Sequence, residues 1–210
     1  MKEEILKIIE KERLNPKKKY NKPFLVLLTG EVGSGKSLVA ELLSQALNLY
    51  LINGDYVRNI VKRLDPNIEI ATPEVRKVIN EVCLNEMSYC EKNNYSIILD
   101  RSVSNYKDLS YIKNKRNLPI IFIRLLSSDL ENIKRVEERS YKRNNKIPHY
   151  GHQETTSGVV TKEEYNRIKK TKVYDLEDTI YDYFLNTNTS LEELKENLEK
   201  IIINIKNKYN

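Results

Sequence analysis

Residues 30–37 contain three glycines, a lysine and two serines, and this combination could bind phosphate. The segment reads Gly30-Glu31-Val32-Gly33-Ser34-Gly35-Lys36-Ser37 and fits the phosphate-binding pattern G-x-x-x-x-G-K-[ST]. Glycine lets the backbone turn its N–H groups toward an anion, and a following helix adds the positive end of its dipole. Lys36 is predicted to reach the β- and γ-phosphates of ATP, and the Ser37 hydroxyl to occupy one position on Mg²⁺. Leu38 is included as the last residue of this phosphate-binding loop.

Two aspartates follow predicted strands and could complete such a site. Asp100 ends an apolar strand, so it is predicted to hold Mg²⁺ together with Ser37, although a helix cap is the alternative. Asp55 could orient an acceptor hydroxyl and take its proton. Arg58 lies one helical turn later and could grip a phosphate or sulfate on the acceptor, although an ion pair within the helix is the alternative.

Arg135, Arg139 and Arg143 are spaced by four residues, so one predicted helix presents three guanidinium groups in a row. Such groups can neutralise the charge that spreads over a phosphoryl group during its transfer. We therefore predict a lid at about residues 128–160, with the segment 144–160 as its loop. Glutamates on the same helix leave open the alternative of an exposed helix with many salt bridges.

These groups need a scaffold that brings them to one edge. Apolar runs predict five strands, at residues 24–28, 49–52, 96–100, 120–125 and 181–185. Helical patterns alternate with them, and Thr72, Ser128 and Ser190 are expected as helix caps. The chain is therefore predicted to be α/β, a doubly wound five-stranded parallel sheet with helices on both faces and a helical lid. Ligands of such a sheet bind at the carboxyl ends of its strands.

Composition sets wider limits on the class of protein. The 210 residues are 40% hydrophobic and 31% charged, which is typical of a soluble globular protein without a membrane segment. We expect a main domain at residues 23–210, preceded by an N-terminal helix and basic linker at residues 1–22. Cys83 and Cys90 are expected to be reduced core residues of a cytoplasmic protein. The net charge of +6 is compatible with nucleic acid or phosphorylated small molecules and chooses neither.

With these motifs in place, the chain from residue 24 onward resembles the P-loop kinase superfamily. Gly54-Asp55-Tyr56-Val57-Arg58 is similar to the acceptor-binding Gly-Asp-x-x-Arg of several branches, including the polynucleotide 5′-hydroxyl kinases. Residues 182–194 resemble the closing strand and helix. The resemblance implies that Asp55, Arg58 and Arg101 bind the acceptor. It also implies that Arg135 contacts the nucleotide, and that Arg139 and Arg143 act in catalysis with Lys36.

The departures from the superfamily patterns narrow the expected acceptor. Monophosphate kinases typically have Asp-Gly-Phe-Pro-Arg where this chain has Asp100-Arg101-Ser102-Val103-Ser104. A hydroxyl acceptor is therefore favoured over a phosphate acceptor. The expected function is an ATP- and Mg²⁺-dependent phosphotransferase acting on a hydroxyl of a nucleotide-like molecule or a nucleic-acid 5′ end. The alternatives are a nucleoside monophosphate kinase and a nucleotide-dependent regulatory ATPase without an acceptor. The oligomeric state is left open.

Overall fold

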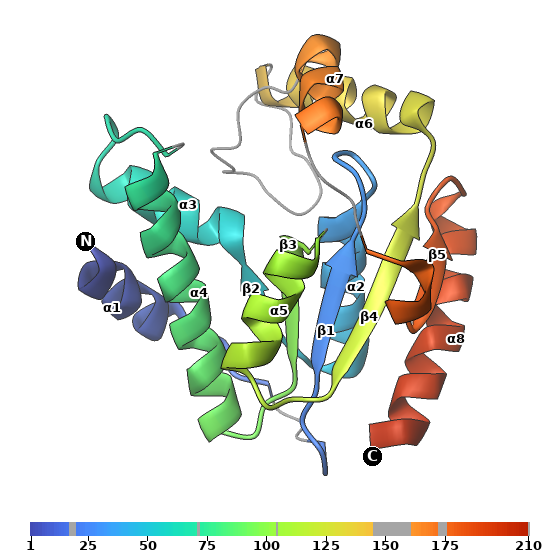
Figure 1. Ribbon diagram of the computed structural model, residues 1–210, viewed down its shortest axis with the longest axis horizontal. Coiled ribbons are helices and arrows are strands. Elements are labelled where there is room, and N and C mark those ends of the chain that lie inside the picture. The colour runs from blue at the N-terminus through green and yellow to red at the C-terminus, as the bar shows by residue number, and fades with distance from the viewer. Residues whose placement is uncertain (17–19, 71, 104, 145–160, 172–175, 210) are drawn as a thin grey trace.

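A computed structural model describes residues 1–16, 20–70, 72–103, 105–144, 161–171 and 176–209. Within them, parallel strands form one sheet in the spatial order β2-β3-β1-β4-β5 (Figure 1). The strands are β1 Leu25–Thr29, β2 Tyr50–Asn53, β3 Ile97–Ser102, β4 Ile120–Leu126 and β5 Tyr183–Asn186. The five strands expected from the sequence and the parallel α/β fold are therefore confirmed.

Helices cover both faces of this sheet. The helices of the described chain are α1 Lys2–Glu12, α2 Lys36–Leu47, α3 Gly54–Leu64, α4 Pro73–Lys92, α5 Tyr106–Lys115, α6 Asp129–Asn144, α7 Lys162–Thr171 and α8 Leu191–Tyr209, with a 3₁₀ turn at Asp178–Ile180. The three expected caps are present, because the side-chain oxygens of Thr72, Ser128 and Ser190 each accept a hydrogen bond from a backbone N–H of the first helical turn. Such a cap contributes about 1 kcal/mol to helix stability.

The core consists of two buried clusters, one on each face of the sheet. Leu25 and Leu27 of β1 are buried against the side covered by α1, α3, α4 and α5. Val26 and Leu28 of the same strand are buried against α2 and α8. Because alternate residues of a strand face opposite sides, a continuous apolar run is what a doubly covered strand requires.

The pairing of β1 with β3 is irregular near the carboxyl ends of the two strands. Leu27 of β1 lies beside Leu99 of β3, but the next residue of β1 lies beside Ser102. Asp100 and Arg101 are therefore extra residues in this pairing, and the strand bends there as it does at a β-bulge. The polar end of β3 is thus set apart from the regular ladder, next to the loop that follows β1.

Two helices lie above the carboxyl ends of the strands. In Figure 1, α6 and α7 sit over the ends of β1 and β4, and α6 continues directly from β4. Helix α6 contacts the phosphate-binding loop: a Cβ on Gly33 would lie 2.6 Å from the backbone oxygen of Asn132. The first part of the predicted lid is therefore a helix packed on the loop, and residues 145–160 lie outside the described part of the chain.

Helix α1 is attached to the side of the sheet that carries α3 and α4. Its residues Ile5 and Ile9 are buried in the same cluster as those helices. After the helix, Arg13 donates to the buried carboxylate of Glu86 at 2.8 Å, and the Tyr50 hydroxyl donates to the same carboxylate. Helix α1 therefore shares a hydrophobic core with the helices of the main domain. The domain boundary at residue 22 stays a prediction.

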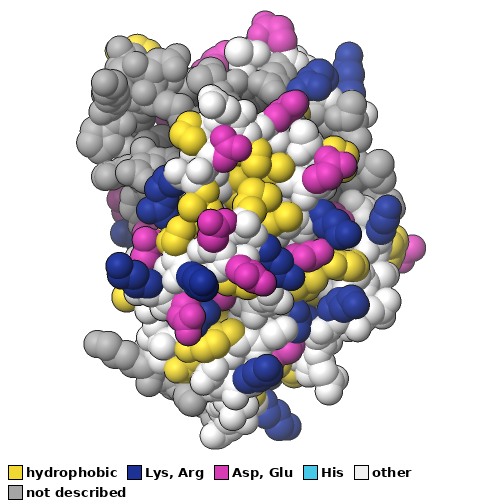
Figure 2. Space-filling view, turned by 90° about the vertical axis from the view of Figure 1, so that its left-hand side faces the viewer, with side chains coloured by type: hydrophobic (Ala, Val, Ile, Leu, Met, Phe, Trp, Pro, Cys, Tyr) yellow, Lys and Arg dark blue, Asp and Glu magenta, His cyan; other side chains and the backbone are white. Residues whose placement is uncertain are grey.

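The side of the molecule where α1 and α4 lie carries both signs of charge. Figure 2 shows lysine and arginine side chains interspersed with aspartate and glutamate, with hydrophobic side chains between them. On this face the positive side chains are spread among the negative ones rather than gathered in one basic patch. In the described part of the chain, no helix is both long and apolar enough to span a membrane.

Candidate active site

The phosphate-binding loop connects β1 to α2 and has the backbone shape that its glycines allow. Gly33 and Gly35 both have φ of +83°, a left-handed conformation that other residues adopt at a cost. Gly30 and Ser34 are buried, and Val32 and Leu38 are half-buried at either end of the turn. Helix α2 begins at Lys36, so the positive end of its dipole opens into this loop.

The side chain of Lys36 folds over the phosphate-binding loop and contacts it at three residues. Its ammonium group donates to the backbone oxygens of Gly30 at 2.8 Å and Glu31 at 2.5 Å, and to the Ser34 hydroxyl at 3.2 Å. A phosphate held by the loop would compete with these oxygens for the ammonium group. The lysine is therefore in place to join the loop to a bound anion.

The two predicted metal ligands lie side by side. The Ser37 hydroxyl donates to Asp100 Oδ1 at 3.3 Å. This contact follows from the sheet, because β3 lies next to β1 and bends at Asp100. A hydroxyl and a carboxylate are oxygen ligands of the kind that Mg²⁺ takes. The pair therefore fits a magnesium ion shared with a nucleotide in the loop.

The predicted acceptor residues begin the neighbouring helix. Asn53, which pairs with Asp100 in the sheet, caps α3 by accepting from the N–H groups of Asp55 at 2.8 Å and Tyr56 at 3.1 Å. Asp55 and Arg58 form an ion pair one turn apart. In this structure the two side chains therefore satisfy each other, as the alternative considered from the sequence allows. A role toward an acceptor stays a prediction.

Arg101 takes a different direction from its neighbour Asp100. Its side chain is exposed and donates to Asn80 Oδ1 on α4 at 2.5 Å. It therefore lies on the α4 side of the sheet edge. Its assignment to the acceptor is a prediction to which the described contacts add nothing.

The arginines of α6 differ in their surroundings. Arg135 donates to the backbone oxygen of Gly33 at 3.5 Å and to that of Thr187, and its Nε bonds Glu131 at 3.0 Å. It thus joins the phosphate-binding loop to the loop after β5. Arg139 is exposed one turn farther along the helix, and the side chain of Arg143 lies outside the described residues. Arg135 is therefore the arginine of this row with a described contact to the loop.

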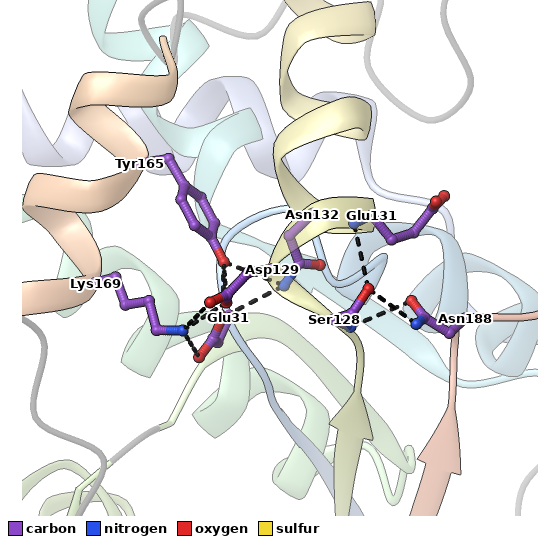
Figure 3. A network of polar contacts seen from close by, with 8 residues as sticks. All are labelled: Glu31, Ser128, Asp129, Glu131, Asn132, Tyr165, Lys169 and Asn188. Carbon is purple, nitrogen blue, oxygen red and sulfur yellow. Dashed lines mark hydrogen bonds and ion pairs between the residues drawn. The ribbon is translucent and has the colours of Figure 1, made fainter.

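A network of polar side chains fastens α6 and α7 to the loop (Figure 3). Its centre is Glu31, the second residue of the loop, whose carboxylate accepts from the hydroxyl of Tyr165 at 2.8 Å. Asn132 donates to the same carboxylate oxygen at 3.4 Å, and Lys169 lies 3.6 Å from the other oxygen. Asp129 binds Lys169 as well. The loop is therefore joined to both helices through one carboxylate.

Sequence reasoning missed most of these connecting residues. Asn53 carried a usable signal, because asparagine directly before a helix is a preferred cap. Tyr165 and Ile168 are three residues apart in an otherwise polar helix, which marks the inward face of α7. Asn132 and Lys169 carried no such signal, since polar residues on charged helices are usually solvated.

Comparisons with known proteins agree with this geometry. The AAA domain family matches residues 26–158, a stretch that includes the phosphate-binding loop. No curated protein sequence matches the chain significantly.

Among solved structures, several kinases have similar folds. The APS kinase of Mycobacterium tuberculosis, in complex with AMPPNP and APS, has a TM-score of 0.54 and 16% identity, over 85% of this chain and 96% of that one. A gluconokinase of Sinorhizobium meliloti has a TM-score of 0.53 and 16% identity, over 91% and 99%. The shikimate kinase of Acinetobacter baumannii, in complex with shikimate, has a TM-score of 0.51 and 16% identity, over 88% and 95%.

Proposed function

The chain belongs to the AAA domain family, and on this basis we propose that it is an ATP- and Mg²⁺-dependent phosphotransferase. It would move the γ-phosphate of ATP to a hydroxyl group of an acceptor. The observation that carries this proposal is the meeting of Ser37 and Asp100 at 3.3 Å beside the glycine loop. The pair supports the proposal because a metal ion bound to the β- and γ-phosphates would need oxygen ligands of this kind beside the loop.

The donor side of the reaction would be carried by the loop and α2. Backbone N–H groups and the amino end of α2 would hold the phosphates, and Lys36 would follow the γ-phosphate as its charge redistributes. Ser37 and Asp100 would hold Mg²⁺, which when bound neutralises charge on the phosphate oxygens. Arg135, which reaches the Gly33 carbonyl, would add a cation on the side of α6. Arg139 and Arg143 would do so farther along the helix.

The acceptor side would be carried by the start of α3. Asn53 pairs with Asp100 in the sheet and caps α3, so Asp55 lies at the same edge of the sheet as Ser37 and Asp100. Asp55 would take the proton of the acceptor hydroxyl as the oxygen attacks phosphorus. Arg58, now paired with Asp55, would turn to an anionic group on the acceptor. Arg101, at the end of β3, would be a further contact to the acceptor.

The acceptor class we propose is a small, nucleotide-like molecule with a hydroxyl and an anionic group. Arg58 supports the anionic group, since guanidinium binds phosphate, sulfate or carboxylate in two-pronged fashion. Of the kinases with a similar fold, one was solved with AMPPNP and APS and another with shikimate, and a third is a gluconokinase; APS and shikimate are small molecules. A nucleic-acid 5′-hydroxyl, also expected from the sequence, has no support among these comparisons and becomes one arm of the test.

The cysteines support a reducing compartment, and the cytoplasm is part of the proposal. Cys83 and Cys90 are both free and buried. Burial raises the pKa of the Cys83 thiol to about 11, so the thiol stays protonated and unreactive.

A screen of acceptors tests the proposal. Purified chain, Mg²⁺ and γ-labelled ATP would be incubated with sugars, small hydroxy acids, nucleosides, nucleoside monophosphates and a single-stranded oligonucleotide with a free 5′ end. Label on a small hydroxyl compound supports the proposal. Label on a monophosphate, giving a diphosphate, identifies a nucleoside monophosphate kinase. Label released only as inorganic phosphate identifies a regulatory ATPase.

A further inference from the structure

Within the phosphate-binding loop, Glu31 is the one acidic residue. A carboxylate so close to bound phosphates repels them, and the repulsion is strongest where water is partly excluded. Glu31 is half-buried, so screening by solvent is incomplete. A loop that binds triphosphate therefore needs some group to neutralise this residue.

Compensation comes from α7, more than a hundred residues away in sequence. It consists of a hydrogen bond from Tyr165 and the positive charge of Lys169, which Asp129 shares. The Tyr165 hydroxyl lies 2.8 Å from Glu31 Oε2, and the ammonium group of Lys169 lies 3.6 Å from Oε1. Figure 3 shows both side chains reaching from α7 toward the loop. Tyr165 is only 1% exposed, so its hydroxyl has few partners other than this cluster.

Helix α6 holds α7 in the position from which it can do this. Asp129 accepts from Lys169 at 2.5 Å and lies 3.0 Å from the Tyr165 hydroxyl. Asn132, which is fully buried, lies 3.4 Å from both Tyr165 and Glu31. Lys169 therefore faces two carboxylates at once, and its bond to Asp129 raises the pKa of its ammonium group, which stays charged.

The backbone of Glu31 extends the connection to the catalytic lysine. Its carbonyl oxygen accepts from Lys36 at 2.5 Å, while its side chain binds Tyr165 and Lys169. Any displacement of Glu31 toward solvent would therefore move an oxygen that holds Lys36. The loop's shape and its charge both depend on the same residue.

We propose that Tyr165 and Lys169 are positioning residues of the nucleotide site: Tyr165 anchors Glu31 by a hydrogen bond, and Lys169 offsets part of its charge, so that the loop can accept the phosphates of ATP. The inference rests on the proposed function of the loop as an ATP site. It assigns to α7 a role that neither the family match nor the sequence motifs give. These residues act through Glu31 and need not touch the nucleotide.

Calorimetric titration of each variant with Mg²⁺ and ATP, in the absence of any acceptor, tests this directly. Lys169→Met should weaken ATP binding by about threefold to fivefold, since an exposed charge interaction is worth up to about a factor of five. The effect should shrink at high salt, because the interaction is electrostatic. Lys170→Met, on the exposed neighbour in the same helical turn, is the matched control and should bind as the wild type does.

A second pair of variants separates neutralisation from simple structural support. In a Glu31→Gln background there is no carboxylate to neutralise, so adding Lys169→Met should change the affinity by less than about twofold. Tyr165→Phe should weaken binding in the wild-type background and lose most of that effect with Glu31→Gln. An equal loss in both backgrounds, or no loss from Lys169→Met at all, overturns the proposal.

The outcome is distinguishable from failure of the proposed function. A chain that binds ATP, depends on Lys169 through Glu31, and transfers phosphate to no acceptor supports this inference and refutes the phosphotransferase. A chain that transfers phosphate normally with Lys169→Met, at unchanged affinity for ATP, does the reverse. A chain that binds no ATP refutes both.

Discussion

The Ser37 hydroxyl donates to Asp100 Oδ1 at 3.3 Å, although the two residues are 63 positions apart in the chain. The contact exists because β3 lies beside β1 and departs from the regular ladder at Asp100. It places a serine of the phosphate-binding loop and a strand-end carboxylate around one position. In the proposed mechanism Mg²⁺ would occupy that position, so the order of the strands is what brings the two proposed metal ligands together.

The two strand-end carboxylates are expected to have different tasks. Asp55→Asn should remove phosphate transfer while leaving Mg²⁺–ATP binding near normal, because an amide cannot accept the acceptor's proton. Asp100→Asn should instead raise the Mg²⁺ concentration needed for activity. Calorimetry of ATP binding with and without Mg²⁺ on both variants is the measurement. If Asp55→Asn lost the enhancement by Mg²⁺ and Asp100→Asn kept it, the two assignments would be reversed.

Arg139 is predicted to act in the transition state rather than in binding. Arg139→Ala should lower kcat by about tenfold or more and change the affinity for ATP less, since its contact would form only when the lid closes. Lys134→Ala, on an exposed residue of the same helix, is the control for loss of a charge. Steady-state kinetics at saturating acceptor decide the matter: an unchanged kcat would assign Arg139 to the solvated surface.

The glycines of the loop offer a matched pair of substitutions. Gly33 and Gly35 share a φ of +83°, so alanine is strained at both by about 1 kcal/mol. Only at Gly33 would the added Cβ meet backbone, 2.6 Å from the Asn132 oxygen, whereas at Gly35 the nearest contact is Arg135 at 3.9 Å. Gly33→Ala should therefore lower the free energy of unfolding more than Gly35→Ala does. Equal losses in urea denaturation would show that α6 does not rest on the loop in solution.

The fold was predictable because its strands are uninterrupted apolar runs. Residues 120–125, for example, are almost all large and hydrophobic, and β4 spans Ile120–Leu126. A strand that is covered on both faces of the sheet requires such a run. The glycine motif then identifies the strand that precedes the phosphate-binding loop. The resemblance to P-loop kinases is confirmed for the fold, which several solved kinases share, and the family model that matches the chain is that of the AAA domain.

The candidate site was predictable only where a residue type is tied to its chemistry. The loop and Asp100 follow from motif and strand end, and the structure brings Ser37 and Asp100 together. Glu31 was predicted only as part of the loop. Its side-chain contacts could not be predicted, because it occupies a position at which the motif accepts any residue. Its partners Tyr165 and Lys169 become neighbours only when α7 folds back over the loop, a tertiary contact that no local pattern records.

The link between α6 and α7 should depend on pH in a defined direction. The Lys169 ammonium group beside it lowers the pKa of Asp129 below its ordinary value of 3.8, so the stabilisation is present above that pH and is lost as pH falls. The pKa of Lys169 is raised above 10.5 by its bond to Asp129, so the stabilisation is also lost when pH rises beyond that value.

The difference in unfolding free energy between the wild type and Lys169→Met measures this link. It should be largest between about pH 5 and pH 9, at no more than about 1 kcal/mol for a pair near the surface, and should shrink on either side. Lys170→Met supplies the control for removing a lysine from α7. A difference that stayed constant from pH 3 to pH 7 would rule out the bond to Asp129 as its source.

Formation of ADP with and without an acceptor, in wild-type and Lys36→Ala chains, distinguishes a phosphotransferase from an ATPase. A phosphotransferase should form ADP only with an acceptor, in a one-to-one ratio to phosphorylated product. Lys36→Ala should lower kcat by about a hundredfold or more with an unchanged circular dichroism spectrum. Lys195→Ala, on the exposed face of α8, should behave as the wild type. Equal turnover by Lys36→Ala, or ADP formation that ignores every acceptor, would contradict the phosphotransferase.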